Sequence, residues 1–225
     1  MLAIQVAELR FATEEGVLVF DRLSFGVPRD GFVWLVGPAG SGKTLILRIL
    51  LGEVRPHGGQ ILLLGRNILR VSAKKFQELR RKVGYMPEEL RVLPRHTVLG
   101  NLQFKLRALG VTGEVATEAI ERALDLAQLR GREREYPENL SSFELKCLDL
   151  ALALCPECSV LLVDDPLRNL TPEAQDAFLS VLIRTNQAGV TILGTSREVA
   201  PLRRAGFSPS GGTQAIVYLR EGVSG

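Results

Sequence analysis

A glycine-rich segment early in the chain restricts its fold most strongly. Residues 37–44 read GPAGSGKT, which matches the pattern G-x-x-x-x-G-K-[ST] of a phosphate-binding P-loop. An apolar, β-prone run, Phe32 to Val36, precedes this segment, and the apolar start of a helix, Leu45 to Leu50, follows it. A strand, a glycine turn and a helix in this order are the context in which the motif binds phosphate, and they favour that interpretation over an ordinary glycine-rich turn.

The residue types of this segment suit a nucleotide phosphate. Glycines let the backbone curl tightly and approach an anion without a Cβ in the way. Backbone N–H groups and the N-terminus of the following helix then face the anion together. Lys43 is predicted to lie on the β- and γ-phosphates, and the Thr44 hydroxyl in the shell of a Mg²⁺ ion. The predicted phosphate-binding residues are Gly37, Pro38, Ala39, Gly40, Ser41, Gly42, Lys43 and Thr44.

The composition is that of a soluble globular protein. The 225 residues are 46% hydrophobic and 24% charged, and suffice for one large domain or two small ones. The 28 Lys and Arg residues exceed the 25 Asp and Glu residues only slightly, so nucleic acid is not an expected partner. Charges interrupt every apolar run, and an early charge argues against a signal peptide. We therefore expect a cytoplasmic protein that reaches a membrane only through a partner.

The three cysteines, Cys147, Cys155 and Cys158, do not form a disulfide framework in a chain of this length. Residues 155–158 have C-x-x-C spacing, but there is no second pair to complete a zinc site. Two interpretations remain open. The thiols are either buried and unreactive, which we favour, or a redox pair.

Strands and helices are predicted to alternate along the chain. Ile4–Phe11 and Val17–Val27 alternate apolar and polar residues, as the two strands of a hairpin do. From residue 88 to about 156 the apolar spacing is helical. Val160–Val163 is fully apolar, like a buried parallel strand, and Thr171-Pro172 opens another helix. Two further strands are expected at 189–194 and 215–219. The pattern predicts a mainly parallel sheet covered by helices and divided by a helical insertion.

Two acidic residues follow the apolar run at 160–163. An acid at the end of a core strand, in a chain that also carries a P-loop, is typical of the Walker B arrangement. Asp164 is predicted to hold Mg²⁺ through its water shell, and Asp165 lies where a base for the attacking water would be. The alternative is a pair of aspartates that merely cap the strand.

The chain as a whole resembles the nucleotide-binding subunit of ABC-type ATPases, and within that family the short FtsE and lipoprotein-release group. The ordered set of segments carries the resemblance more specifically than the P-loop alone, which many NTPases share. These segments are residues 37–44, 81–86, 97–98, 140–141, 160–166 and 169–170. The resemblance implies an α/β P-loop NTPase fold, with a RecA-like parallel sheet core, an antiparallel β subdomain and a helical insertion. It also implies a single ATP-binding domain over 1–225, in which 1–87 and 157–225 form the core and 88–156 the helical subdomain.

The resemblance assigns further site positions, some of which depart from the family pattern. ATP and Mg²⁺ are the implied ligands, with Thr44, Asp164 and Glu88 at the metal. Glu88 stands where the family has a glutamine, and adds negative charge there. The family signature LSGGE or LSGGQ reads LSSFE here, so side chains replace the two glycines. The implied signature residues are Ser141, Ser142, Phe143 and Glu144.

The catalytic positions depart as well. Asp165 stands for the family's glutamate and is one methylene shorter, and Ser196 stands for the histidine that contacts the γ-phosphate. Thr171 stands for an aspartate. The aromatic residue that stacks on adenine has no clear counterpart, since Phe11 is the nearest and Thr13 occupies the expected register. Losing a general base alone lowers a rate by about 10² to 10⁴. We therefore expect hydrolysis to be slow or lost, although slow turnover through Ser141, Glu88 and Asp165 is an alternative.

The expected function is that of an ATP-binding subunit at the inner face of the cell membrane. The resemblance implies an integral membrane partner, FtsX-like or a permease, and a head-to-tail dimer with itself or with a homologous subunit. Nucleotide would shift that dimer between two states. Resemblance to FtsE also implies a role in cell division. Two alternatives remain: an active ABC transporter ATPase, and a P-loop kinase that phosphorylates a small molecule.

Overall fold

The computed structural model describes residues 1–209 and 212–219, and the chain divides into two compact units. The first unit contains residues 1–80 together with the segment that begins at Thr191, and the second contains residues 81–190. The predicted division into a core and a helical subdomain at 88–156 stays a prediction. Each unit is described below by itself.

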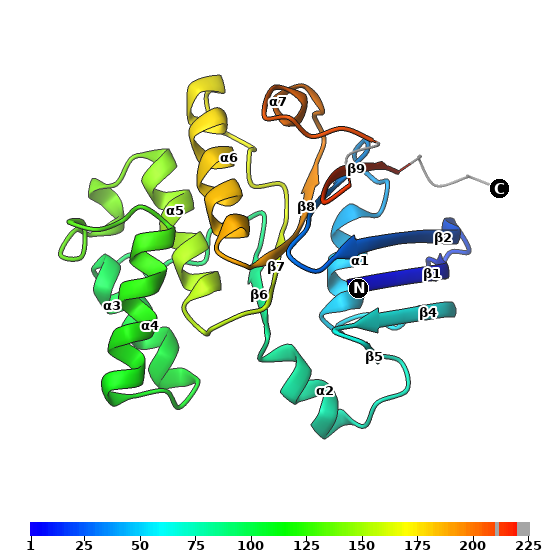
Figure 1. Ribbon diagram of the computed structural model, residues 1–225, viewed down its shortest axis with the longest axis horizontal. Coiled ribbons are helices and arrows are strands. Elements are labelled where there is room, and N and C mark those ends of the chain that lie inside the picture. Colours follow the sequence, from blue (N-terminus) through cyan, green and yellow to red (C-terminus); the bar gives the residue numbers. More distant parts are fainter. Residues whose placement is uncertain (210–211, 220–225) are drawn as a thin grey trace. The chain divides into compact units, whose positions relative to one another are not determined.

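An antiparallel sheet forms one layer of the first unit. Its strands are β1 (Leu2–Ala12), β2 (Leu18–Pro28), β4 (Gly58–Leu63) and β5 (Arg66–Asn67). Their order is β2-β1-β4-β5, and Figure 1 shows β2, β1 and β4 side by side. Along β1 the side chains of Ile4 and Val6 are buried, as the alternation of apolar and polar residues predicts, and a register shift between Val6 and Leu9 brings Leu9 to a buried position too. The expected hairpin is confirmed, because β1 and β2 pair in antiparallel register.

Three parallel strands form a second sheet region in the first unit. β3 (Phe32–Val36) pairs on one edge with β8 (Thr191–Ser196) and on the other with β9 (Gln214–Tyr218), both in parallel. All five residues of β3 are buried. The rings of Phe32 and Phe207 lie 4.8 Å apart, edge to face, which joins the strand to the chain after α7 (Ala200–Arg204). Two more helices, α1 (Lys43–Leu50) and α2 (Ala73–Arg80), belong to this unit.

The second unit is mostly helical. Its two strands, β6 (Val83–Met86) and β7 (Val160–Val163), pair in parallel. Its helices are α3 (Val98–Ala108), α4 (Gly113–Leu126), the short 3-10 helix η1 (Pro137–Asn139), α5 (Ser142–Leu154) and α6 (Pro172–Gln187). α5 packs against α3, α4 and α6, with α3 to α5 forming the green group in Figure 1. From Lys146 to Leu154 every residue of α5 is buried, which makes this helix the centre of the unit.

Hydroxyl side chains determine where three of these helices begin. Thr97, Ser141 and Thr171 each precede a helix, and each side-chain oxygen accepts a hydrogen bond from the backbone N–H three residues later. A cap of this kind satisfies one of the backbone donors that the first helical turn leaves open. Thr171 therefore has a structural role as the N-cap of α6.

Most predicted elements are present, with bounds that differ by one or two residues. The strand expected at 189–194 lies at Thr191–Ser196, because Thr195 and Ser196 continue the parallel pairing with β3. The two-residue strand β5 and the helix η1 were not predicted. Of the loop expected at 206–213, residues 210–211 lie outside the described residues, while Ser208 forms a bridge with Ala215. Among the described residues, no helix combines the length and the apolar character that crossing a bilayer requires.

Candidate functional site

The P-loop of the first unit lies between β3 and α1, as the sequence predicts. Gly37 directly follows the buried end of β3, and Lys43 is the first residue of α1. The ammonium of Lys43 donates to the carbonyl oxygens of Gly37 (2.7 Å) and Pro38 (2.6 Å), and to the Ser41 hydroxyl at 3.2 Å. Lys43 is only 7% exposed. The loop therefore holds its positive charge close to the backbone that a phosphate would contact.

The N-terminus of α1 suits an anion. Its N-cap is Gly42, which has no side chain to cap the first turn, and that turn contains no acidic residue. The backbone of Gly42 has a φ of 83°, and a Cβ there would lie 2.4 Å from Cζ of Phe20. A glycine is required here for two reasons, the left-handed backbone and the ring packed above it. The exposed Thr44 belongs to the same first turn. Helix N-terminus, glycine backbone and lysine together fit the phosphates of a nucleotide.

Ser196 lies next to the P-loop in the first unit. Its carbonyl oxygen, at the end of β8, accepts a hydrogen bond from the N–H of Gly37 at 3.3 Å. Its hydroxyl donates to the Glu198 carbonyl oxygen at 2.9 Å and accepts from the Glu198 N–H at 3.1 Å. The side chain is 2% exposed and is engaged in its own turn. A role for Ser196 at the γ-phosphate stays a prediction.

Asp164 and Asp165 follow β7 in the second unit, and both are buried. The backbone N–H of Asp164 donates to the Met86 carbonyl oxygen at 2.8 Å, which ties the end of β7 to the end of β6. Asp165 has a φ of 41°, a left-handed conformation that is uncommon for a residue other than glycine. Backbone strain of this kind is often found at functional sites. The metal role of Asp164 and the base role of Asp165 stay predictions.

Glu88 is held by two cations of the second unit. Its carboxylate forms an ion pair with the guanidinium of Arg168, and its carbonyl oxygen accepts from the Lys146 ammonium at 3.4 Å. Burial lowers the pKa of Lys146, while the charges of Asp149 and Asp165 act in the opposite direction. The predicted metal ligand Glu88 is therefore already neutralised by an arginine. Sequence reasoning missed Arg168, because nothing local marks it as the partner of a residue 80 positions earlier.

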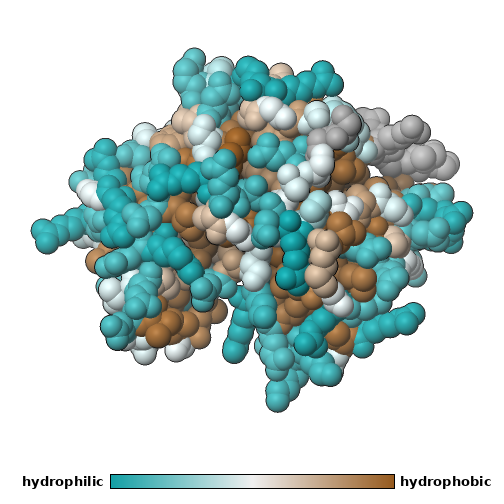
Figure 2. Space-filling model, viewed as in Figure 1, coloured by the Kyte–Doolittle hydropathy of each residue, from teal (hydrophilic) through white to brown (hydrophobic). Residues whose placement is uncertain are grey.

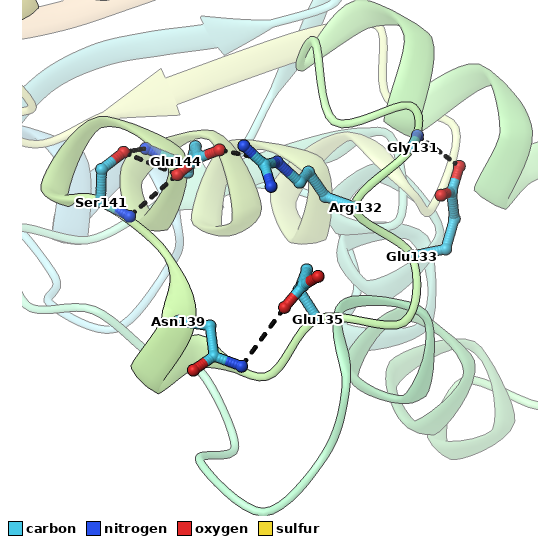
Figure 3. A network of polar contacts seen from close by, with 7 residues as sticks. All are labelled: Gly131, Arg132, Glu133, Glu135, Asn139, Ser141 and Glu144. Atoms are coloured by element: carbon cyan, nitrogen blue, oxygen red, sulfur yellow. Dashed lines mark hydrogen bonds and ion pairs between the residues drawn. The ribbon is translucent and has the colours of Figure 1, made fainter.

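Two of the predicted signature residues, Ser141 and Glu144, lie at the start of α5 and hydrogen-bond to each other (Figure 3). The Ser141 hydroxyl accepts from the Glu144 N–H at 3.2 Å. The Glu144 carboxylate in turn accepts from the Ser141 N–H (2.9 Å) and hydroxyl (2.8 Å), which completes a capping box. Arg132 forms an ion pair with the same carboxylate at 2.9 Å. These contacts, above all the Ser141 N–H, lower the pKa of Glu144.

The other two signature residues, Ser142 and Phe143, occupy the first turn of α5. Ser142 is exposed, and the ring of Phe143 packs edge to face on Phe178 of α6, with centroids 6.5 Å apart. The ring of Phe143 thus packs α5 against α6. Any role of these two residues in binding nucleotide stays a prediction.

The cysteines fit the interpretation of unreactive thiols. Cys147 and Cys155 are buried, Cys158 is partly buried, and no disulfide occurs within the described part of the chain. Burial raises the pKa of Cys147 to about 12 and the pKa values of Cys155 and Cys158 to about 11. Thiols with such values are protonated at neutral pH and are poor nucleophiles.

A preformed metal cage is absent from the described residues, where no three His, Cys, Asp or Glu side chains come together. This donor set still fits Mg²⁺ in a nucleotide complex. That ion keeps several waters and takes phosphate oxygens with only one or two protein ligands.

Comparison with known proteins gives a consistent picture. A family model described as ABC transporter matches residues 20–168. The cell division ATP-binding protein FtsE of Bacillus subtilis (strain 168) is 29% identical over 190 residues, which cover 84% of this chain and 83% of the relative. The methionine import ATP-binding protein MetN of Geobacillus kaustophilus (strain HTA426) is 29% identical over 201 residues, 89% of this chain. The chain spans 59% of that relative's length.

Solved structures share the fold. CbiO1 from Clostridium perfringens, part of the ABC transporter complex cbiONQ, superposes with a TM-score of 0.88 at 19% identity, covering 98% of this chain and 86% of that one. A bacterial ABC transporter cassette in dimeric form gives a TM-score of 0.78 at 21% identity, covering 97% and 95%. The predicted P-loop NTPase fold, with parallel and antiparallel sheets and a helical insertion, is confirmed.

Proposed function

The chain belongs to the ABC transporter family, and from this premise we propose that it is the ATP-binding subunit of a membrane complex. The observation that carries the proposal is the P-loop, in which the Lys43 ammonium lies on the loop carbonyls at an α1 N-terminus without a side-chain cap. The dimeric cassette compared above was also solved in a post-hydrolysis state with ADP and Pi, which supports a nucleotide as the ligand.

In this proposal the P-loop backbone and Lys43 hold the β- and γ-phosphates. Mg²⁺, when bound, neutralises the phosphate charge, with Thr44, Asp164 and Glu88 as its proposed protein ligands. Asp165 and Ser196 occupy the positions of base and γ-phosphate contact. We propose slow or absent hydrolysis, because the Ser196 hydroxyl is bound within its own turn and Glu88 is paired with Arg168.

Calorimetry with ATP and Mg²⁺ tests the proposal. Lys43→Ala should weaken ATP binding at least tenfold, because it removes the charge on the β- and γ-phosphates. Lys74→Ala is the matched control, since Lys74 is an exposed lysine on α2 of the same unit, and it should bind as tightly as the wild type. Equal affinity of the wild type and the Lys43→Ala variant would refute the proposed site.

The membrane partner is proposed to contact the stretch from Glu88 to Phe104. Leu90 is 39% exposed and Phe104 54%, and the segment between β6 and α3 is irregular, with Leu93 partly buried. Apolar side chains spaced among turn residues form a groove suited to a short partner helix. The alternative is that they only cap the core of the second unit.

Replacing Leu90 and Leu93 with Asp separates these alternatives. A folded variant that still binds ATP but leaves the membrane fraction supports docking at this stretch. Global unfolding favours the core interpretation, and unchanged association with the membrane fraction removes the proposed contact.

An active transporter ATPase is the second candidate. It is favoured by MetN, a methionine import protein by name, which matches at the same 29% identity as FtsE. Steady-state phosphate release decides between the two candidates, because a transport ATPase turns over at about 1 s⁻¹ or faster.

A further inference from the structure

An ion pair in the second unit joins Glu88, a proposed ligand of Mg²⁺, to Arg168, which the proposed function does not itself place at the metal or the nucleotide. β6 and β7 are parallel, and at their ends the N–H of Asp164 donates to the carbonyl oxygen of Met86. The two segments that follow these strands therefore leave the sheet side by side. They bring together two side chains of opposite charge that are 80 positions apart in the chain.

The backbone that carries Arg168 is a compact turn. Asp165 and Asn169, on either side of Arg168, have φ values of 41° and 62°, in the left-handed region. The N–H of Arg168 donates to the carbonyl oxygen of Asp165 at 3.3 Å. The side-chain amide of Gln175, on α6, donates to two further carbonyl oxygens of the turn, at 3.3 and 3.4 Å. The turn is therefore fixed at several points, and it presents the guanidinium at one place.

The two contacts of Glu88 differ in how easily they can be exchanged. The Arg168 side chain is 49% exposed and the Glu88 side chain 26%, so that water and ions reach the pair. A guanidinium with this exposure can leave the carboxylate and stay hydrated. The Lys146 ammonium, which donates to the carbonyl oxygen of Glu88, is only 7% exposed and belongs to the buried part of α5. The backbone of Glu88 is therefore anchored, while the partner of its carboxylate is replaceable.

The charges of Glu88 and Arg168 cancel, and the binding of a nucleotide depends on this balance. A lone carboxylate repels the phosphates of ATP and attracts a divalent cation, whereas a neutral pair does neither strongly. A guanidinium and a metal ion are both stabilised by the same carboxylate oxygens. The two cations therefore exclude one another at Glu88, and Arg168 is a competitor of the metal that belongs to the chain itself.

The surroundings of the pair favour an ion over a protein segment as the ligand. Figure 2 shows hydrophobic surface over the α3–α4 part of the second unit, where Leu109 and Val115 are exposed. Neither Glu88 nor Arg168 belongs to these helices, and Glu89, the next residue in the chain, is charged and exposed as well. The pair offers charge and hydrogen bonds, which suit a hydrated metal ion.

We propose that Arg168 is a positioning residue that competes with Mg²⁺ for the carboxylate of Glu88. The inference rests on the proposed function, because it concerns how ATP and Mg²⁺ are held where Glu88 is a proposed ligand. Without the ion, the guanidinium holds the carboxylate and shields ATP from its charge. With the ion, the carboxylate exchanges one cation for the other, and breaking the pair offsets part of the free energy of metal binding. Arg168 thus lowers the dependence of ATP binding on Mg²⁺.

Calorimetry with and without the metal measures this competition. The quantity to compare is the Kd of ATP in EDTA divided by the Kd of ATP in excess Mg²⁺, here called the Mg²⁺ ratio. Arg168→Gln should raise the Mg²⁺ ratio about tenfold, because the carboxylate then repels ATP alone and is available to the metal. Arg168→Lys keeps the charge without the planar fork, and should stay within about threefold of the wild type. Arg134→Gln is the matched control, since it removes the same charge from an exposed arginine of the same unit, and it should leave the ratio unchanged.

A second substitution shows whether the effect depends on Glu88. In a Glu88→Gln background there is no carboxylate to compete for, so Arg168→Gln should change the Mg²⁺ ratio by no more than about twofold. A merely structural role of Arg168 would weaken ATP binding equally with and without the metal, and would leave the ratio unchanged. Thermal unfolding shows that each variant is folded, and Arg168→Met, which keeps the apolar stem, replaces Arg168→Gln if that variant does not fold.

Three results overturn the inference: an unchanged or lower Mg²⁺ ratio in Arg168→Gln, an equal rise in the Glu88→Gln background, or an equal rise in Arg134→Gln. Each of them is measured on a protein that binds ATP, so the proposed function survives. A wild-type chain that binds ATP neither with nor without Mg²⁺ overturns the proposed function, and the inference with it.

Discussion

The buried, charged carboxylate of Asp149 destabilises the folded state by an amount that depends on pH. Its folded pKa of about 6 lies above its ordinary value of 3.8, so the folded state binds a proton more tightly than the unfolded state. The destabilisation is therefore complete above pH 6 and fades as the pH falls toward 3.8. Asp149→Asn should raise the free energy of unfolding by up to about 3 kcal/mol at pH 8, and by less at pH 5.

Urea unfolding at both pH values measures this effect. Asp125→Asn is the control, because Asp125 is exposed and paired with Arg130, which lowers its pKa. It should not stabilise the protein at either pH. A destabilising Asp149→Asn at pH 8 would show that the carboxylate makes a net favourable contribution in its charged form.

The charged carboxylate of Glu144, in contrast to that of Asp149, stabilises the folded state. Its pKa is lowered, so the stability it contributes is present above its ordinary value of 4.5 and is lost as the pH falls through the lower, folded value. Glu144→Ala should lower the free energy of unfolding by about 0.5–2 kcal/mol at pH 7, the usual cost of a lost helix cap. The difference from wild type should shrink in acid. Glu118→Ala, an exposed residue within α4, should change stability far less.

At the scale of elements, one buried amide organises the segment that leads into α3. The Asn101 side chain accepts from the Leu93 N–H at 2.7 Å and donates to the carbonyl oxygens of Leu93 (3.1 Å), His96 (3.0 Å) and Thr97 (3.0 Å). Asn101→Ala leaves the Leu93 N–H without this acceptor and should cost about 1–3 kcal/mol, although the carbonyl oxygens of Leu93 and Thr97 keep backbone donors. Hydrogen exchange should show the Leu93 amide exchanging faster than in the wild type.

Gln103→Ala on the same helix is the matched control, because the Gln103 side chain makes none of these hydrogen bonds. An unchanged Leu93 exchange rate in Asn101→Ala would mean that the segment holds its shape without the amide.

Local patterns predicted the elements well. Val160–Val163 was predicted with its observed bounds, because a short apolar run between turn residues indicates a strand. The end of β8 was not predicted, because Thr195 and Ser196 are polar. These two residues belong to the strand through their backbone pairing with β3 and not through apolar character. Two polar residues, Arg66 and Asn67, are too few for any periodicity, so β5 was not predicted.

The candidate site was predicted unevenly. The P-loop follows from its residue types, because its chemistry is local to eight consecutive residues. The pairing of Glu88 with Arg168 joins residues far apart in the chain and leaves no local signal. Asp149 lies in a run of Leu and Ala, where helical spacing predicts burial without indicating that a pocket adjoins the carboxylate. Contacts of this kind can be identified only from the packed structure, because they join residues that lie far apart in the sequence.

At the scale of the whole molecule, the expected loss of ATP hydrolysis has several causes, because several catalytic positions differ from the family pattern at once. Asp165→Glu alone should restore little turnover, because catalytic groups that act as a unit are not additive. Combining it with Ser196→His, Ser142→Gly and Phe143→Gly should raise phosphate release well above any single change. Wild-type turnover at about 1 s⁻¹ or faster would contradict this prediction. Since Phe143 also packs on Phe178, the combined variant must first be shown to fold by thermal unfolding.

The ring of Phe20 above Gly42 has a consequence for how this chain tolerates sequence change. A Cβ at position 42 would fall within 2.4 Å of that ring, so the hairpin strand β2 and the P-loop cannot vary independently. Phe20→Leu opens room beside the loop, yet position 42 still needs a left-handed backbone. The two positions are therefore coupled only in part: a smaller residue at 20 removes the clash with the ring, while the clash with Cγ1 of Val19, at 2.8 Å from a Cβ at position 42, remains.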